Sequence, residues 1–345
     1  MYSFQNDYSE GAHQNILRAL ETINYHQNNS YGLDEHCDNA RDKIQEALEN
    51  YGVDIHFITG GTLTNLTFLS HALRPYEAVI SADTGHINTH ETGAIEASGH
   101  KVLSIPCTDG KLTADLIRPV LKQHENEHWV EPRLVYISLP TELGTVYTKE
   151  ELEKLYQFCK RHSLYLYIDG ARLAMALAVE ETQLTLKDLP DLCDAFYIGG
   201  TKNGAMFGEA LVLVNDDLKD HFRFNMKQRG AILAKGWMIG VQFEELFQDN
   251  LYLELGKRSV ALAQRLKQGF IDCKIPFLCD SPTNQLFPIF PDEFAKKINE
   301  NYVTTFQCKP DENHTCLRFC TSWATNEQAV EDFIKDLKQW SYIYA

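Results

Sequence analysis

Seven short runs of apolar residues recur between residues 54 and 215, and amphipathic segments separate several of them. The runs span 54–59, 77–83, 101–106, 132–140, 164–169, 195–200 and 209–215. The segments at 113–123 and 149–162 have the apolar spacing of helices, and Thr148 with Glu151 matches the start of a capped helix. Because strands covered on both faces read as almost continuously apolar, this alternation predicts an α/β fold with a mainly parallel sheet.

The pattern changes after about residue 230. Two long helical segments, 233–248 and 250–270, are followed by short strands and a last amphipathic helix near 326–340. A chain of 345 residues is too long for one ordinary core. We therefore expect a large domain over 15–235 and a smaller C-terminal α+β domain over 236–345, with residues 1–14 packing on the smaller one.

Charge and cysteine content restrict the partners and the compartment. The chain has 32 Lys and Arg against 48 Asp and Glu, a formal net charge of −16 that disfavours nucleic acid. Nine irregularly spaced cysteines without a CxxC pair favour reduced thiols. The polar N-terminus has no signal-like apolar core, and no apolar run is long enough to cross a membrane. These features predict a cytoplasmic protein.

Residues just after the strands of an open α/β sheet are the ones that usually bind ligands. The turn at 59–65, "TGGTLTN", leads into a helix whose free amides and Thr62 hydroxyl could bind phosphate, although an ordinary capped turn reads the same way. The segment 83–93 carries His86, His90 and Glu91. A zinc site is disfavoured because no third ligand is evident, which leaves a surface histidine or a His86 ring stacked on a ligand with Glu91 nearby.

Two charged residues follow later strands. Asp169 ends an apolar run, so its carboxylate needs a cation, either Arg172 three residues later or a protonated ligand nitrogen. Lys202 follows the next strand, in "GGTKNGAMFGEA". Burial would favour its neutral amine, which can attack a carbonyl carbon; the alternative is a lysine that reaches solvent or pairs with an acid.

Together these groups are the parts that hold pyridoxal phosphate: an amine, a carboxylate, a flat ring partner and a phosphate site. At this point the sequence resembles the fold-type I enzymes that use this cofactor, and more narrowly the L-threonine aldolase and β-eliminating lyase family. The matching segments are 28–44, 61–65, 73–94, 169–174 and 199–208. The resemblance implies a three-layer αβα large domain like that of the pyridoxal-phosphate-dependent transferases, and no metal.

The resemblance also implies roles for individual residues. The catalytic residues would be Lys202, which forms the internal aldimine, Asp169, which pairs with the pyridine nitrogen, and His86, which stacks on the ring. Other cofactor contacts would come from Gly61, Thr62, Thr201, Arg172 and, in a neighbouring subunit's phosphate site, Lys235. On the substrate side, Arg318 would clamp the carboxylate, and the remaining contacts would be Arg172, Asn6, Tyr31 and Glu91.

The chain departs from the family where a second active-site histidine is expected. Residues 138–148 read "SLPTELGTVYT", with Thr141 and Glu142 and no histidine. Asn6 stands where many members have a serine, and Lys235 stands roughly where an arginine is expected. The missing histidine leaves the base that deprotonates the substrate hydroxyl unassigned.

The predicted function is that of a pyridoxal-phosphate-dependent carbon–carbon lyase. It would cleave threonine, allo-threonine or a related β-hydroxy-α-amino acid to glycine and an aldehyde. The alternatives are a β-eliminating lyase acting on an aromatic or sulfur amino acid, an aminotransferase, and a noncatalytic cofactor- or metabolite-binding protein. By resemblance, we expect a homodimer or homotetramer with shared active sites that binds neither nucleic acid nor membrane.

Overall fold

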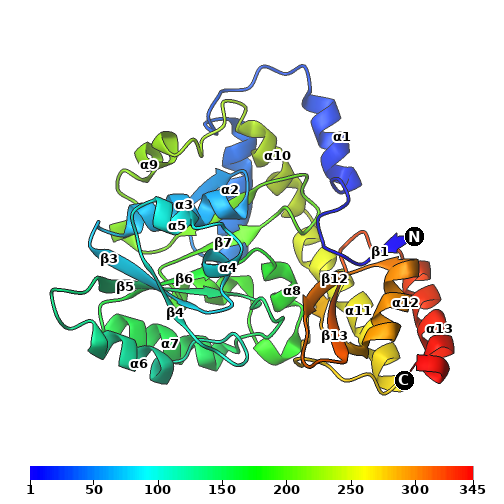
Figure 1. Ribbon diagram of the computed structural model, residues 1–345. Coiled ribbons are helices and arrows are strands. Elements are labelled where there is room, and N and C mark those ends of the chain that lie inside the picture. Colours follow the sequence, from blue (N-terminus) through cyan, green and yellow to red (C-terminus); the bar gives the residue numbers. More distant parts are fainter. Residues whose placement is uncertain (345) are drawn as a thin grey trace.

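The computed structural model describes residues 1–344 and has two unequal lobes (Figure 1). The larger lobe surrounds a seven-stranded sheet, and the smaller lobe contains the C-terminal helices together with short strands. The predicted α/β fold class is confirmed. None of the helices within residues 1–344 combines the length and apolar character needed to span a membrane.

The seven predicted runs form the central sheet. In spatial order its strands are β2 (Asp54–Ile58), β8 (Glu209–Leu213), β7 (Ala195–Gly199), β6 (Tyr165–Asp169), β5 (Glu131–Ser138), β3 (Glu77–Ala82) and β4 (Val102–Ile105). The five strands from β7 to β4 are parallel, whereas β8 runs antiparallel to both of its neighbours. Every residue of β3, β7 and β8 is buried, which explains their continuously apolar sequence.

Helices cover both faces of this sheet, as the three-layer prediction requires. Alternate residues of β5 divide between two cores: Val135 and Ile137 join one, and Leu134 and Tyr136 join the other. The first core is completed by α2 (Glu35–Leu48), α6 (Ala114–Gln123), α7 (Lys149–Arg161), α8 (Leu173–Leu177) and α10 (Trp237–Leu246). The second is completed by α3 (Gly61–Ala72), α5 (Ala94–Ala97) and α9 (Phe222–Gln228). The predicted capping box at Thr148 and Glu151 is present at the start of α7.

The smaller lobe has its own aromatic core. Its elements are α11 (Leu251–Asp272), β9 (Gln285–Leu286), β10 (Ile289–Pro291), α12 (Asp292–Asn301), β11 (Tyr302–Val303), β12 (Thr305–Cys308), β13 (His314–Cys320) and α13 (Glu327–Tyr344). The N-terminal strand β1 (Tyr2–Ser3) pairs with β11, and Phe4 is fully buried against Phe319 and Phe333. The chain therefore starts in the smaller lobe, as Figure 1 shows, before α1 (Gln14–Ile23).

The packing of α10 and α11 bears on the boundary between the lobes, which the sequence analysis placed at residue 235. Ile239 and Phe243 of α10 belong to the core of the large sheet, because Gly240 lets α10 approach the backbone of Cys37 in α2. Within α11, Val260 joins the core of the large lobe and Leu262 that of the smaller one. We therefore propose that α11 is shared and that the boundary lies near residue 260 rather than at 235. Near the N-terminus, Ala12 packs in the large lobe, so the segment that packs on the smaller lobe is shorter than residues 1–14.

Candidate active site

A cavity of about 410 Å³ lies beyond the carboxyl ends of the parallel strands. Seven of the residues predicted for the site line it: Gly61, Thr62, His86, Asp169, Arg172, Thr201 and Lys202. They come from turns that follow β2, β3, β6 and β7. Groups from distant parts of the sequence meet here because parallel strands present their carboxyl ends at one edge of the sheet.

Asp169 is held as a buried anion by three donors. Its Oδ2 accepts hydrogen bonds from the Tyr136 hydroxyl at 2.6 Å and from Asn65 Nδ2 at 3.0 Å, and its Oδ1 accepts one from the Ala171 backbone at 3.0 Å. Burial acts to raise the pKa of Asp169, but nearby His86 and the hydrogen bonds outweigh it and lower that pKa. Asp169 is therefore an ionised acceptor suited to a protonated ring nitrogen.

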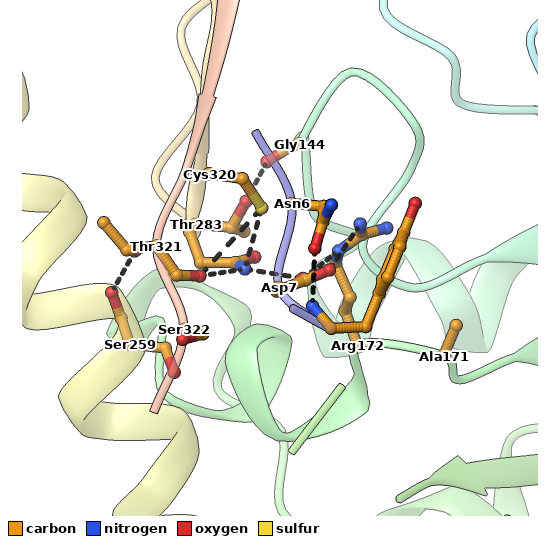
Figure 2. Close-up of polar contacts among 12 residues, drawn as sticks. Asn6, Asp7, Gly144, Ala171, Arg172, Ser259, Thr283, Cys320, Thr321 and Ser322 are labelled. Carbon is orange, nitrogen blue, oxygen red and sulfur yellow. Dashed lines mark hydrogen bonds and ion pairs between the residues drawn. The ribbon is translucent and has the colours of Figure 1, made fainter. Parts of the chain in front are cut away.

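Arg172 pairs with Asp7 rather than with Asp169, so the predicted Arg172–Asp169 alternative is wrong. Arg172 Nε lies 2.6 Å from Asp7 Oδ2, and its Nη2 lies 3.0 Å from Oδ1. Asn284 Nδ2, from the smaller lobe, donates to the same Asp7 Oδ2 at 2.9 Å. Figure 2 shows Asp7 on the N-terminal segment, between Arg172 and the chain at Cys320 and Thr321. One buried ion pair thus ties the N-terminal segment and the smaller lobe to the cavity wall.

The surroundings of this ion pair keep Asp7 ionised. Burial opposes the charge of Asp7, but Arg172 and then Lys202 lower the pKa of Asp7 to about 2. No residue within 1–344 accepts a hydrogen bond from Arg172 Nη1. Because Arg172 also lines the cavity, Nη1 is the part of this guanidinium that remains for a ligand.

Lys202 lies in the turn between β7 and β8 and has no ion-pair or hydrogen-bond partner among residues 1–344. Burial lowers the pKa of Lys202, and the positive charge of Arg172 lowers it further against the opposing effect of Asp7 and Asp169. The alternative that Lys202 pairs with an acid is therefore wrong within residues 1–344. An unpaired amine of lowered pKa in a cavity wall can act as a nucleophile toward a carbonyl group.

His86 begins the short helix α4 (His86–Thr89), and a carboxylate behind it orients its ring. Its Nδ1 lies 2.7 Å from Glu91 Oε1, which also accepts a hydrogen bond from Asn65 at 2.7 Å. Burial lowers the pKa of His86, but Glu91 and Asp169 outweigh this effect and raise it. Glu91 is buried and does not line the cavity. We therefore propose that Glu91 positions His86 instead of contacting substrate.

The turn before α3 leaves backbone amides free at a helix N-terminus, as the predicted phosphate site requires. Gly60 caps the helix without a side-chain hydrogen bond, so amides of the first turn remain free at the helix N-terminus. A side chain at Gly61 would place its Cβ 3.0 Å from the Tyr197 hydroxyl, a tight contact that Tyr197 would have to relieve by a small shift. Thr201 is less available to a phosphate than predicted, because its hydroxyl donates a hydrogen bond to Glu209 at 2.8 Å. Thr201 would have to release Glu209 to donate to a phosphate.

Besides Glu91, four predicted residues do not line the cavity of the single chain. Lys235 is exposed, and Tyr31 borders a separate small cavity beside Arg223. Asn6 turns its Oδ1 to the backbone of Tyr8 and the hydroxyl of Ser9. Arg318 lies on β13, where its Nη2 donates to the Gln5 carbonyl at 3.4 Å. The roles assigned to Lys235, Tyr31, Asn6 and Arg318 stay predictions.

The cavity also contains groups that the sequence analysis left without a role. Glu142 and Glu209 line it, and Asn65 and Tyr136 support Asp169 from behind. A signal existed for Glu209, since a carboxylate opens the otherwise apolar strand 209–213. No comparable signal existed for Tyr136, because a tyrosine in an apolar strand reads as core.

Comparisons with known proteins identify the family of this chain. The family described as "Beta-eliminating lyase" matches residues 9–290. A low specificity L-threonine aldolase from Pseudomonas sp. (strain NCIMB 10558) is 30% identical over 97% of this chain and 96% of its own length. The solved structure of a threonine aldolase from Leishmania major is 50% identical, with a TM-score of 0.98 over 99% of this chain and 100% of that one. An aminotransferase from Staphylococcus aureus is 12% identical with a TM-score of 0.73 over 99% of this chain and 93% of that one, so it shares the fold alone.

Proposed function

Since the chain belongs to the beta-eliminating lyase family, we infer that it is a pyridoxal-phosphate-dependent lyase that cleaves threonine or a related β-hydroxy-α-amino acid to glycine and an aldehyde. One observation carries the chemical side of this inference. An unpaired lysine of lowered pKa, Lys202, and a buried carboxylate of lowered pKa, Asp169, line the same cavity.

The residues present fit the cofactor. We propose that Lys202 attaches its aldehyde carbon, that Asp169 pairs with its ring nitrogen and that His86 packs on its ring. The free amides at Gly61 and Thr62 would hold the phosphate. Bound pyridoxal phosphate supplies an electron sink for the bond that is broken at the α-carbon of an amino acid.

The chain itself binds and orients the substrate. Arg172 Nη1 is free on the cavity wall, and we propose that it and Arg318 bind the substrate carboxylate, since a guanidinium suits that planar group. Asp7 fixes Arg172 through two hydrogen bonds, so this donor is already in place before substrate arrives. Holding the carboxylate determines which bond at the α-carbon is aligned for cleavage.

Threonine cleavage is favoured over the alternative reactions. The Pseudomonas and Leishmania proteins, which match nearly the whole chain, are both threonine aldolases. The resemblance to aminotransferases lies at the level of the fold. A noncatalytic binding protein is disfavoured because the amine and the carboxylate that the chemistry needs are both in the cavity.

We further propose a homodimer or homotetramer whose sites are shared between subunits. This would explain why Lys235 and Tyr31 lie outside the cavity of the single chain, where Tyr31 is 42% exposed. We also propose a reducing, cytoplasmic location, which the nine free cysteines support.

The function is tested by incubating the purified, cofactor-loaded protein with L-threonine and with L-allo-threonine. We expect glycine and acetaldehyde in equal amounts, whereas a 2-oxo acid with ammonia would indicate elimination instead. Borohydride reduction should attach the cofactor to Lys202, and the Lys202→Ala protein should form neither product. Attachment to another lysine would refute the assignment of Lys202.

A further inference from the structure

Glu142 is a carboxylate on the cavity wall with one oxygen fixed by two other residues and the second oxygen without a hydrogen bond to another residue within 1–344. It lies in the loop after β5, where Oε1 accepts hydrogen bonds from the His86 backbone at 2.8 Å and from the Ser138 hydroxyl at 2.6 Å. No hydrogen bond joins its Oε2 to another residue within 1–344. The side chain is thus held in place next to His86 while Oε2 is left to accept a proton.

The other carboxylates in the cavity wall are already engaged. Asp169 accepts three hydrogen bonds. Both oxygens of Glu209 accept hydrogen bonds, from Thr201 at 2.8 Å and from the Gly200 backbone at 2.9 Å. Each oxygen of Asp169 and Glu209 thus already accepts at least one hydrogen bond, and Asp169 is in addition the proposed partner of the cofactor's ring nitrogen.

The two histidines of the cavity differ as acceptors, because the pKa of His86 is raised whereas burial and the charge of His86 lower the pKa of His90. The Nδ1 proton of His86 is held by Glu91, and the pKa of His86 is raised, which favours the cation. His90 is exposed, and its ring stacks on that of His86 at 5.4 Å. Its Nδ1 lies 2.6 Å from the Thr89 hydroxyl. His90 is therefore the second candidate, and it is less shielded from water than Glu142.

We propose that Glu142 is the catalytic base that removes the β-hydroxyl proton of threonine, an inference that rests on the proposed function. The proton moves from the hydroxyl oxygen to Glu142 Oε2, and the electron pair of that O–H bond forms the carbonyl bond of acetaldehyde. The Cα–Cβ bond breaks and its electron pair stays with the α-carbon. The α-carbon then takes up a proton, so threonine yields glycine and acetaldehyde without a further reactant.

The surroundings of Glu142 increase its strength as a base. Burial raises its pKa, and the charge of Asp169 adds to this, while the hydrogen bonds from Ser138 and from its own backbone N–H, and the charge of His86, oppose it. A carboxylate of raised pKa binds a proton more firmly than an exposed one and is better matched to a hydroxyl at neutral pH.

The test is the isosteric variant Glu142→Gln in the cofactor-loaded protein. The glutamine carbonyl can still accept from the His86 backbone and from Ser138, so only Oε2 changes, from an acceptor to an NH₂ donor. We expect kcat for threonine to fall by about 100-fold or more, the usual contribution of a general base. Glycine binding, read from the absorption spectrum of the bound cofactor, should change by less than about threefold, because glycine has no hydroxyl to deprotonate.

Exchange of the α-hydrogen of glycine with D₂O, followed by NMR, gives the second readout. This exchange should stay within about threefold of wild type in the Glu142→Gln protein, because it also bypasses the hydroxyl step. If exchange falls as far as threonine cleavage does, Glu142 positions His86 and is not the base. Cleavage of threonine by Glu142→Gln within about fivefold of the wild-type rate would also overturn the proposal.

His90→Asn distinguishes the second candidate. We expect this variant to keep threonine cleavage within about tenfold of wild type; a loss of about 100-fold, with Glu142→Gln active, would assign the base to His90. Failure of the proposed function looks different from either result. In that case the wild-type protein itself would bind glycine yet release no acetaldehyde from threonine.

Discussion

At the scale of single residues, Glu209 is a buried carboxyl group that makes the site sensitive to pH. Burial raises its pKa from 4.5 to about 7, although Thr201 and Lys202 act to lower it. The charged groups near Glu209 are Lys202 and Asp169. The hydroxyls of Tyr197 and Tyr252 also lie near it and are neutral. Because its pKa is higher in the folded protein than in the unfolded chain, its contribution to stability is complete below pH 4.5 and is lost as the pH rises through about 7.

Replacing Glu209 with Gln removes this titration. Between about pH 4.5 and 8, the unfolding free energy of the cofactor-free wild-type protein should fall by about 3 kcal/mol relative to that of Glu209→Gln, since one pKa unit corresponds to about 1.4 kcal/mol. Urea unfolding across this pH range measures the difference. If the unfolding free energies of the two proteins changed with pH in parallel, Glu209 would not titrate in this pH range.

At the scale of elements, the N-terminal segment joins the two lobes through Asp7. Strand β1 pairs with β11 of the smaller lobe, and four residues after the end of that strand Asp7 binds Arg172 next to the cavity. Asp7→Asn would leave the Arg172 guanidinium buried without its carboxylate, and we expect a loss of about 3–5 kcal/mol in unfolding free energy. Threonine cleavage should also fall, because Arg172 loses the partner that orients it.

An exposed ion pair provides the control for Asp7. Asp292 pairs with Lys309 at the surface of the smaller lobe, where both side chains are more than 40% exposed. Asp292→Asn should cost less than about 1 kcal/mol, as exposed pairs usually do. Equal effects of the two substitutions in urea unfolding would argue that the Asp7–Arg172 pair has no special structural role.

At the scale of the whole molecule, the second copy proposed above would contact a surface near Tyr31. Tyr31 lies beneath Lys227, with Nζ 4.5 Å from the ring centre, and its carbonyl accepts a hydrogen bond from Arg223. Leu33, two residues after Tyr31, and Phe224, directly after Arg223, are 59% and 77% exposed. Large exposed apolar side chains of this kind are typical of subunit interfaces.

Mixing two inactive variants tests whether sites are shared. If Lys235 serves the neighbouring subunit, a dimer of one Lys202→Ala chain and one Lys235→Ala chain contains one intact site. Co-expressed chains should then recover about a quarter of wild-type activity, since about half of the dimers are mixed and each has one working site of two. No recovery, or a monomer by light scattering, would contradict shared sites.

Several features of this protein follow from the sequence because they depend on local patterns. The seven apolar runs became the seven strands of the central sheet, and the pairing of Thr148 with Glu151 became a helix cap. Asp169 and Lys202 could be placed in one cavity without coordinates, because residues after parallel strands meet at one edge of the sheet. The alternation of apolar strands with amphipathic helices, and the parallel sheet that it predicts, were enough for these inferences.

Contacts between distant parts of the chain were decided by the tertiary structure alone. Arg172 follows Asp169 by three residues, yet the N-terminal segment brings Asp7 to it from 165 positions away. Similarly, the close packing of α10 against α2 decides that α10 belongs to the large lobe. A local pattern identifies which side chains need a partner, but only the packed chain selects the partner, because burial and charge are set by whatever the fold brings near.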